Sequence, residues 1–235
     1  IPGVECRRRN DAYAAKFPME IIDAMKEREN ICNYLDMPLQ HASNRMLKLM
    51  KRQITREEME DIIGEIKNKI PGICLRTTLI SGFPGETQDD VEELKSFLTK
   101  IQCDRVGIFS YSHEEGTSAH DLVDDISAEE KQRRAEEIME LQQEISYQKN
   151  LEKVGKTFKV IVDKKEAGKY LGRTEFDSVE VDTEVIISSN KKLVIGDFVN
   201  VKITNAYDYD LESEVVSGGV DDYVMTGKGM LIQNP

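Results

Sequence analysis

Paired cysteines and long apolar runs are both missing from this sequence of 235 residues. Its four cysteines lie far apart, so no C-x2-C pair indicates a zinc site or a redox pair, and we expect free thiols and no metal site. Cys74 and Cys103 stand at the heads of predicted strands, where we interpret them as small core residues. No apolar run approaches the roughly 20 residues of a membrane-spanning helix. The first residues also lack the apolar core of a signal peptide, so we expect a cytoplasmic protein without a membrane segment.

Positive charge is in short supply. The chain has 32 Lys and Arg against 44 Asp and Glu, which gives a formal net charge of −12. Such a balance argues against an electrostatic grip on nucleic acid, so we do not expect nucleic acid as a direct substrate, and a basic protein is the easier partner. The length allows two domains with separate cores. Because the sequence starts at Ile1 rather than Met, we expect a piece of a longer chain.

A strand, a glycine turn and a helix are predicted in the middle of the first 150 residues. Ile73–Ile80 is β-branched and apolar between turn residues, as is typical of a buried strand. Thr87 and Asp90 then form a capping box for an amphipathic helix. Glycines in such a turn can serve only to reverse the backbone. The polar run Arg76-Thr77-Thr78, however, must place at least one side chain on the inner face, where it needs a partner or a ligand.

Strands and helices alternate on both sides of this unit. We predict helices from Pro18 to about Arg28, from Ser43, after the Thr55–Glu58 capping box and from Ser127 to about Leu151, and strands at 34–41 and 105–112. This order requires an α/β fold with a parallel sheet and right-handed crossovers. The strands fill only part of a barrel, so earlier ones are missing or hidden in the first residues, where Arg7–Arg9 otherwise read as an exposed loop. Polar residues at the strand ends then share one rim: Gln40, His41, Ser81, Ser110 and Tyr111.

From Gly155 onward the hydrophobic period changes from helical to alternating. Val160 and Val162 face one way and Lys159 the other, and several short strands of this kind predict a small antiparallel β-barrel. Barrels of this size bind RNA or proteins or are purely structural. Residues 151–216 have a net charge of −3 and no aromatic and basic platform for bases. We therefore divide the chain into a partial α/β barrel domain (1–153), a small β-barrel (154–216) and a tail of unknown role (217–235).

Three stretches together resemble one family. Tyr34–Ser43, Arg76–Thr87 and Tyr111–Thr117, in this order, resemble motifs of the radical S-adenosylmethionine methylthiotransferases, and the closing barrel resembles their TRAM domain, an OB-like fold. The likeness spans roughly residues 18–216 and implies part of a parallel (β/α) radical SAM barrel, at its carboxyl-terminal end, followed by TRAM.

A further stretch in the small barrel distinguishes two branches of this family. Gly172–Asp182 resembles the branch that modifies an aspartate of a small-subunit ribosomal protein, rather than the branch that modifies adenosine in tRNA. The acidic barrel supports this choice independently, because a ribosomal protein is basic and a tRNA backbone would be repelled. The tRNA enzyme, and a non-catalytic binding module of the same fold, remain the alternatives.

The resemblance also implies cofactors. Members use a [4Fe-4S] cluster to cleave S-adenosylmethionine to a radical, and a second cluster delivers sulfur. No catalytic residue is assigned by the sequence. By position, we expect six residues to line the S-adenosylmethionine cavity: Gln40, His41, Arg76, Thr78, Phe83 and Tyr111.

One departure from the family is serious. Its cluster is held by C-x3-C-x2-C, and this chain contains no such triplet. Either the chain is a fragment that lacks the upstream cluster-binding part, or the region before Pro18 held the cluster. We expect the chain alone to be inactive. Histidine and glutamates at 113–115 do not share a face, so we predict no metal site there.

Overall fold

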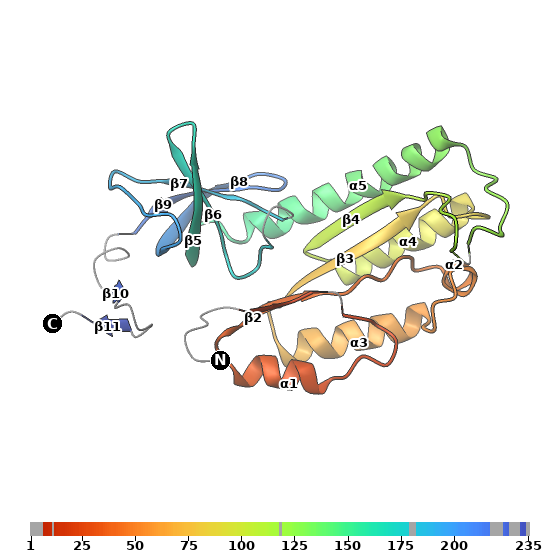
Figure 1. Ribbon diagram of the computed structural model, residues 1–235, viewed down its shortest axis with the longest axis horizontal. Coiled ribbons are helices and arrows are strands. Elements are labelled where there is room, and N and C mark those ends of the chain that lie inside the picture. Colours follow the sequence, from red (N-terminus) through yellow and green to blue (C-terminus); the bar gives the residue numbers. More distant parts are fainter. Residues whose placement is uncertain are drawn as a thin grey trace. The chain divides into compact units, whose positions relative to one another are not determined.

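The computed structural model describes residues 7–10, 12–117, 119–178, 182–216, 223–225 and 231–233. Labelled as in Figure 1, its elements are β1 (Arg7–Arg9), α1 (Glu20–Glu27), β2 (Ile31–Asp36), α2 (Asn44–Leu49), α3 (Arg56–Lys69), β3 (Cys74–Ser81), α4 (Gln88–Ile101), β4 (Arg105–Ser110), α5 (Ala128–Leu151), β5 (Thr157–Glu166), β6 (Lys169–Arg173), β7 (Val185–Ser188), β8 (Phe198–Ala206), β9 (Leu211–Val215), β10 (Tyr223–Met225) and β11 (Leu231–Gln233).

The chain divides into two compact units. One, the sheet unit, comprises residues 9–27 and 35–145; the other, the barrel unit, comprises residues 1–8, 28–34 and 146–235. Each unit is described below by itself.

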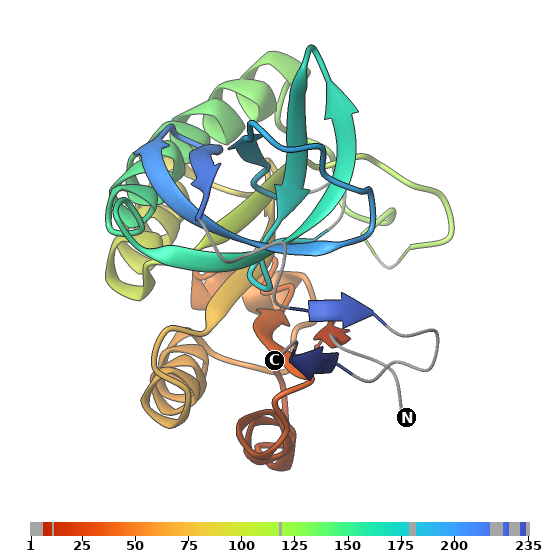
Figure 2. The same cartoon turned by 90° about the vertical axis from the view of Figure 1, so that its left-hand side faces the viewer.

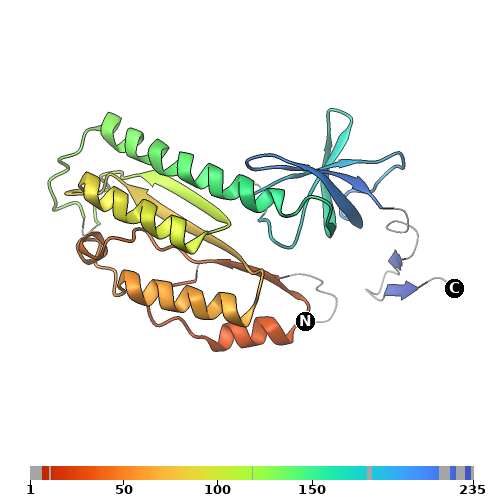
Figure 3. The same cartoon turned by 180° about the vertical axis from the view of Figure 1, so that it is seen from behind.

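A four-stranded sheet with the order β1-β2-β3-β4 organises the first half of the chain. Strands β3 and β4 are parallel, with Arg76 opposite Arg105 and Ser81 opposite Ser110. Helices α1, α3 and α4 cover one face of this sheet (Figure 3). Side chains of β3 therefore alternate between buried positions and the half-buried positions of Arg76 and Thr78. This arrangement confirms the predicted α/β fold with part of a parallel barrel.

Both predicted capping boxes are present. Thr55 accepts a hydrogen bond from the backbone of Glu58 before α3, and Thr87 accepts one from the backbone of Asp90 before α4, and each acidic side chain accepts one in return. The residues that α4 buries follow the predicted helical stripe: Val91, Leu94, Phe97, Leu98 and Ile101. These helix starts depend on contacts three residues apart, which is why the sequence predicts them well.

The second strand was predicted too far along the chain. We expected residues 34–41, but β2 ends at Asp36, and only Gln40 pairs again with β3, opposite Leu79. Pro38 has no N–H group to donate to a ladder, and Gln40 has a φ of 74°, which regular strands do not adopt. The prediction recognised the apolar residues but not this interruption.

The cysteines and the first residues bring two further corrections. Cys74 and Cys103 are buried thiols that form no disulfide, as predicted for small core residues. Cys32 is disulfide-bonded, so the expectation of free thiols is wrong for it; spacing along the chain does not reveal which thiols a fold brings together. Arg7–Arg9 form strand β1 at the edge of the sheet, not a loop. This is an early strand hidden in the first residues.

The second half of the chain folds into a closed barrel of five strands in the order β5-β6-β7-β9-β8 (Figure 2). Its core is formed by residues of the predicted alternation, among them Val160, Val162, Val199, Val201 and Ile203. One pairing differs from the expectation of a purely antiparallel barrel, because β7 and β9 run parallel. Strand β9 enters between β7 and β8 rather than simply following β8 at the edge, and no local pattern predicts that.

The end of the chain and the membrane question can be treated briefly. Strands β10 and β11 pair antiparallel, and the rest of the predicted tail at 217–235 lies outside the described residues. Within the described ranges, every helix is too short or too polar to cross a bilayer.

Candidate functional site

The carboxyl end of β3 is the meeting point of three segments of the sheet unit. The carbonyl oxygen of Gln40 accepts a hydrogen bond of 2.8 Å from the amide of Ile80, and the amide of Tyr111 donates one of 2.8 Å to the carbonyl oxygen of Ser81. Between them the chain leaves β3 through the turn Gly82–Glu86. We call Gln40, this turn and Tyr111 the rim; the structure brings these predicted positions together.

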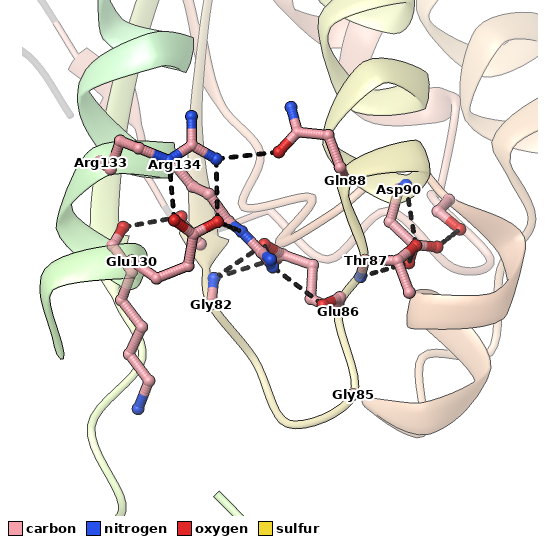
Figure 4. Close-up of polar contacts among 12 residues, drawn as sticks. Gly82, Gly85, Glu86, Thr87, Gln88, Asp90, Glu130, Arg133 and Arg134 are labelled. Atoms are coloured by element: carbon pink, nitrogen blue, oxygen red, sulfur yellow. Dashed lines mark hydrogen bonds and ion pairs between the residues drawn. The ribbon is translucent and has the colours of Figure 1, made fainter. Parts of the chain in front are cut away.

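The glycine turn of the rim is closed by a buried carboxylate. Both oxygens of Glu86 accept hydrogen bonds from the amide of Gly82, at 3.1 and 3.0 Å (Figure 4). Arg134 of α5 donates to Oε1 of Glu86 at 3.1 Å and to its carbonyl oxygen at 2.8 Å. Glu86 is only 4% exposed and Arg134 only 8%, so this is a buried ion pair. It fixes the shape of the turn and ties it to α5.

Arg134 is itself held in place by a second carboxylate. Its Nε donates to Oε1 of Glu130 at 2.7 Å, one helical turn earlier (Figure 4). Arg133 and Arg134 together lower the pKa of Glu130 to about 2. This half-buried carboxylate therefore stays charged beside the guanidinium groups over the whole neutral pH range.

His41 lies under the rim rather than on it. Its side chain is fully buried, and its Nδ1 accepts hydrogen bonds of 2.9 Å from the amides of Ala42 and Ser43. Two donors on Nδ1 place the ring proton on Nε2, which faces Oε2 of Glu86 at 3.5 Å. The imidazole thus supports the start of α2 and lies next to the carboxylate of the glycine turn.

The remaining polar residues of β3 find different partners. Thr77 is buried, and its hydroxyl oxygen accepts a hydrogen bond of 3.1 Å from the amide of Leu39, which satisfies the chain where Pro38 interrupts the pairing. Arg76 and Thr78 lie on the other, half-buried face. The guanidinium of Arg76 donates to Asp36 at 2.9 Å.

The backbone of Arg76 lies away from the rim, although its guanidinium extends to 3.7 Å from a Cβ atom built at Gly107. Arg76 lies five residues before Ser81 in β3, opposite Arg105, the first residue of β4. At roughly 3.3 Å per residue, five residues place it about 16 Å from the strand end. Thr78 is nearer and shares the face of Gly107, where a Cβ atom would lie 4.0 Å from the threonine hydroxyl oxygen. The six expected residues therefore divide into rim positions (Gln40, Phe83, Tyr111), sheet positions (Arg76, Thr78) and one buried support (His41).

Phe83 and Tyr111 form the aromatic part of the rim. Their rings meet edge to face with centroids 5.1 Å apart. The pKa of the Tyr111 phenol is raised by burial and by the negative charges of Asp124 and Glu114. The phenol is therefore protonated at neutral pH and can donate a hydrogen bond.

Three functional candidates were not found from the sequence: Glu86, Arg134 and Lys131. Arg134 is 48 residues from Glu86 and looks like any other charged residue of a long polar helix. In the sequence, Glu86 is one of several polar residues between the predicted strand and the next helix. The glycine at position 82 is the one sequence signal, because a glycine in such a turn is typical of a positive φ or of a close approach by another segment.

The described residues offer no obvious metal centre. Within the ranges that the structure describes, no three His, Cys, Asp or Glu side chains are grouped to hold a metal ion.

Family comparisons agree with this architecture. Residues 10–98 match the Radical SAM superfamily, and residues 154–216 match the TRAM domain. The solved structure of coproporphyrinogen III oxidase from Escherichia coli, a radical SAM enzyme, has a TM-score of 0.51 at 18% identity, over 60% of this chain and 33% of that one. The chain is a radical SAM protein with a TRAM domain.

Its relatives narrow the class. The ribosomal protein uS12 methylthiotransferase RimO of Flavobacterium psychrophilum is 49% identical over 215 residues, 91% of this chain and 50% of that protein. The protein of the same name from Cytophaga hutchinsonii is 50% identical over 217 residues, 92% of this chain and 50% of that protein. The chain thus spans about half the length of the curated relatives it matches. It belongs to the radical SAM methylthiotransferase family, as the three motifs predicted.

Proposed function

We propose that this chain is part of an enzyme that methylthiolates an aspartate of a small-subunit ribosomal protein. The observation that carries the proposal is the identity of 49–50% with proteins named uS12 methylthiotransferases over nine-tenths of the chain. That the target is an aspartate follows only from the likeness of residues 172–182. The tRNA-modifying branch and a non-catalytic module are less well supported, because the relatives at this identity carry the ribosomal protein in their names.

The cofactors of the family fit this chain unequally. A [4Fe-4S] cluster does not fit the described residues, since they contain no group of cysteine thiols, and we propose no step through it. S-Adenosylmethionine fits better, because the half-buried face of Arg76 and Thr78 offers polar groups beside Gly107, which has no side chain. When bound, this cofactor supplies the radical and the methyl group of the family's chemistry.

We assign separate tasks to the residues near that cofactor. Gln40, Phe83 and Tyr111 would border it at the rim, where the protonated Tyr111 can donate a hydrogen bond. Arg76 and Thr78 would contact it from the sheet. His41 would act indirectly, by supporting the turn through Glu86. Aromatic rings at the rim also exclude water from the reacting groups.

The charge of the barrel suits a basic protein. Residues 151–216 carry a net charge of −3 within a chain of −12, so a cationic partner is attracted and a phosphate backbone is repelled. We propose that residues 1–153 belong to the catalytic domain, that 154–216 form the docking module and that 217–235 are appended to it. Ribosomal proteins are made and modified where ribosomes assemble, so we propose a cytoplasmic location.

The direct test uses the product of the whole gene. After anaerobic reconstitution with iron and sulfide, the protein is incubated with S-adenosylmethionine and a reductant, either with the small-subunit ribosomal protein or with tRNA. We expect a methylthio mass gain on an aspartate of the protein and none on tRNA. The 235-residue chain, treated in the same way, serves as the control and should be inactive. An intact cluster with no mass gain on the ribosomal protein would contradict the proposal.

A binding measurement tests the docking module separately. Exposed carboxylates of the barrel are reversed in Glu166→Lys with Glu214→Lys, and the matched control reverses two exposed carboxylates of α3 in Asp61→Lys with Glu65→Lys. Both pairs change the net charge equally. We expect the barrel pair to weaken binding of the ribosomal protein about tenfold and the helix pair to have a much smaller effect, both decreasing with salt. Equal losses would show that only net charge matters.

A further inference from the structure

Lys131 is a buried lysine in the first turn of α5, next to the rim. It is only 6% exposed. Its amide donates to the carbonyl oxygen of Ser127 in the helix, and its own carbonyl oxygen accepts a hydrogen bond of 3.2 Å from the hydroxyl of Ser81 at the end of β3. The backbone of this residue is therefore attached to the strand that carries the rim.

The aliphatic stem of Lys131 packs directly on the glycine turn. A Cβ atom built at Gly82 would lie 2.2 Å from Cγ of Lys131 and 2.8 Å from its Cβ. A side chain at this position would collide with the lysine stem unless one of them shifted, so glycine is favoured by the lysine as well as by its φ of 73°. The stem fills the space that a side chain at Gly82 would otherwise occupy.

The ammonium group of Lys131 lies next to Tyr111, the second aromatic residue of the rim. It lies 5.0 Å from the centre of the Tyr111 ring and 3.5 Å from the carbonyl oxygen of that residue. It also donates to Oδ2 of Asp124 at 2.6 Å. Removing an ammonium group from water is costly unless it is paired, so these contacts are what keep Lys131 in place.

Tyr111 is consequently surrounded on several sides. Phe83 meets its ring edge to face, and His113 approaches its hydroxyl group at 3.4 Å. Asp124 and Glu114 supply negative charge and Lys131 positive charge. Of these neighbours, Phe83 belongs to the glycine turn itself, and Lys131 connects Tyr111 to that turn and to β3 from a separate segment, helix α5.

We propose that Lys131 is a positioning residue that fixes the Tyr111 ring relative to the glycine turn. It acts through its contacts with Tyr111 and Asp124. This role follows from the contacts among the glycine turn, Tyr111 and the first turn of α5, and it does not depend on the reaction. Its consequence for S-adenosylmethionine rests on the proposed function, because only there does Tyr111 border the cofactor.

The test observes Tyr111 directly in the full 235-residue chain. Protein labelled with 3-fluorotyrosine contains eight tyrosines, and the signal of Tyr111 in the fluorine NMR spectrum is assigned with Tyr111→Phe. Lys131→Met keeps the stem over Gly82 and removes the charge, Lys131→Arg retains the charge, and Lys100→Met is the matched control on an exposed lysine. We expect Lys131→Met to shift and broaden the Tyr111 signal relative to the wild type. Lys131→Arg should give a signal close to that of the wild type, and Lys100→Met should leave the signal unchanged.

Titration of the same signal separates positioning from general damage. A nearby cation favours the phenolate and a nearby anion disfavours it. Lys131→Met should therefore raise the pKa of Tyr111, and Asp124→Asn should lower it. Should Lys131→Met fail to fold, the Asp124→Asn and Lys131→Arg variants still decide whether Lys131 positions the Tyr111 ring. Both of these variants keep a cation at position 131. An unchanged Tyr111 signal in folded Lys131→Met, or shifts of equal sign in the two titrations, would overturn the proposal.

The consequence for the cofactor is measured on the whole gene product. We expect Lys131→Met to weaken S-adenosylmethionine binding by about tenfold, with Lys131→Arg close to the wild type. Full activity together with a displaced Tyr111 signal would show that Lys131 positions the ring but that Tyr111 does not serve the cofactor. A wild-type protein that lacks methylthiotransferase activity, with the NMR results as expected, would instead contradict the proposed function and leave the positioning role standing.

Discussion

The hydroxyl group of Ser43 donates a hydrogen bond of 2.7 Å to Oδ1 of Asp90, a residue 47 positions further along the chain. Ser43 precedes α2, and Asp90 lies in the first turn of α4 and forms its capping box with Thr87. One carboxylate thus joins the starts of two helices below the rim. Arg45 completes the cluster by pairing with Asp90 and donating to the carbonyl oxygen of Gly85 at 2.7 Å.

Asp90→Asn should destabilise the fold in a manner that depends on pH. Burial raises the pKa of Asp90, but hydrogen bonds from Arg45, Thr87 and Ser43 outweigh it and hold the pKa well below its ordinary value. A carboxylate whose pKa is lower in the folded state stabilises the fold above about pH 4, and this contribution is lost as the pH falls further. We expect a loss of about 2 kcal/mol at pH 7 that shrinks towards pH 2.

Urea denaturation at a series of pH values measures this effect. Asp89→Asn, at the exposed neighbouring position, is the control and should change the free energy of unfolding little. A difference between Asp90→Asn and the wild type that stays constant from pH 7 to pH 2 would contradict the electrostatic explanation.

Glu86→Gln should be costly although it is nearly isosteric. The amide can still accept from Gly82, but the buried guanidinium of Arg134 loses one of its two carboxylate partners and keeps only Glu130, which costs about 2 kcal/mol. Glu92→Gln, at a largely exposed position, serves as the control. The double variant Glu86→Gln with Arg134→Met should lose less than the sum of the two single losses. Additive losses would show that the two residues are energetically independent.

Two glycines of one turn allow strain and crowding to be separated. Gly82 and Gly85 both have positive φ, at 73° and 79°. A Cβ atom at Gly85 would meet only Leu49, at 4.0 Å, whereas one at Gly82 would collide with Lys131. Gly85→Ala should therefore cost only the backbone term of about 1 kcal/mol, and Gly82→Ala about 3 kcal/mol or more. Chemical denaturation of the two variants makes the comparison; equal costs would show that Lys131 yields easily.

In the barrel, truncation of a buried valine should destabilise the fold more than truncation of an exposed one. Val201 is fully buried in the barrel, and Val194 is 58% exposed. Val201→Ala should lower the free energy of unfolding by about 2 kcal/mol, while Val194→Ala should stay within about 0.5 kcal/mol. Thermal unfolding followed by circular dichroism can compare the two. Similar effects at both sites would mean that Val194 is covered in solution.

Features set by near neighbours in the sequence were predictable. The capping boxes at Thr55 and Thr87 involve residues three apart, and the barrel core follows from strict alternation around Val160 and Val201. Three motifs in order were also sufficient to identify the family. Each capping box, each alternating strand and each single motif lies within about a dozen residues.

Features that depend on distant partners were not predictable. The end of β2 is decided by Pro38 and by the hydroxyl oxygen of Thr77. This oxygen accepts a hydrogen bond from the amide of Leu39, which lies 38 residues earlier in the chain. The support given by Arg134 to the glycine turn spans 48 residues. The role of His41 depends on burial, which a single histidine in a sequence does not reveal. Which residues line the cofactor cavity stays a prediction.

The parallel pairing of β7 with β9 constrains how the barrel can be assembled during synthesis. Because β9 fills the place between β7 and β8, both of those strands keep an unpaired edge until residues 211–215 have left the ribosome. Unpaired edges attract strands of other molecules. Translation that terminates before Leu211 should therefore yield a sticky, aggregating product rather than a smaller barrel.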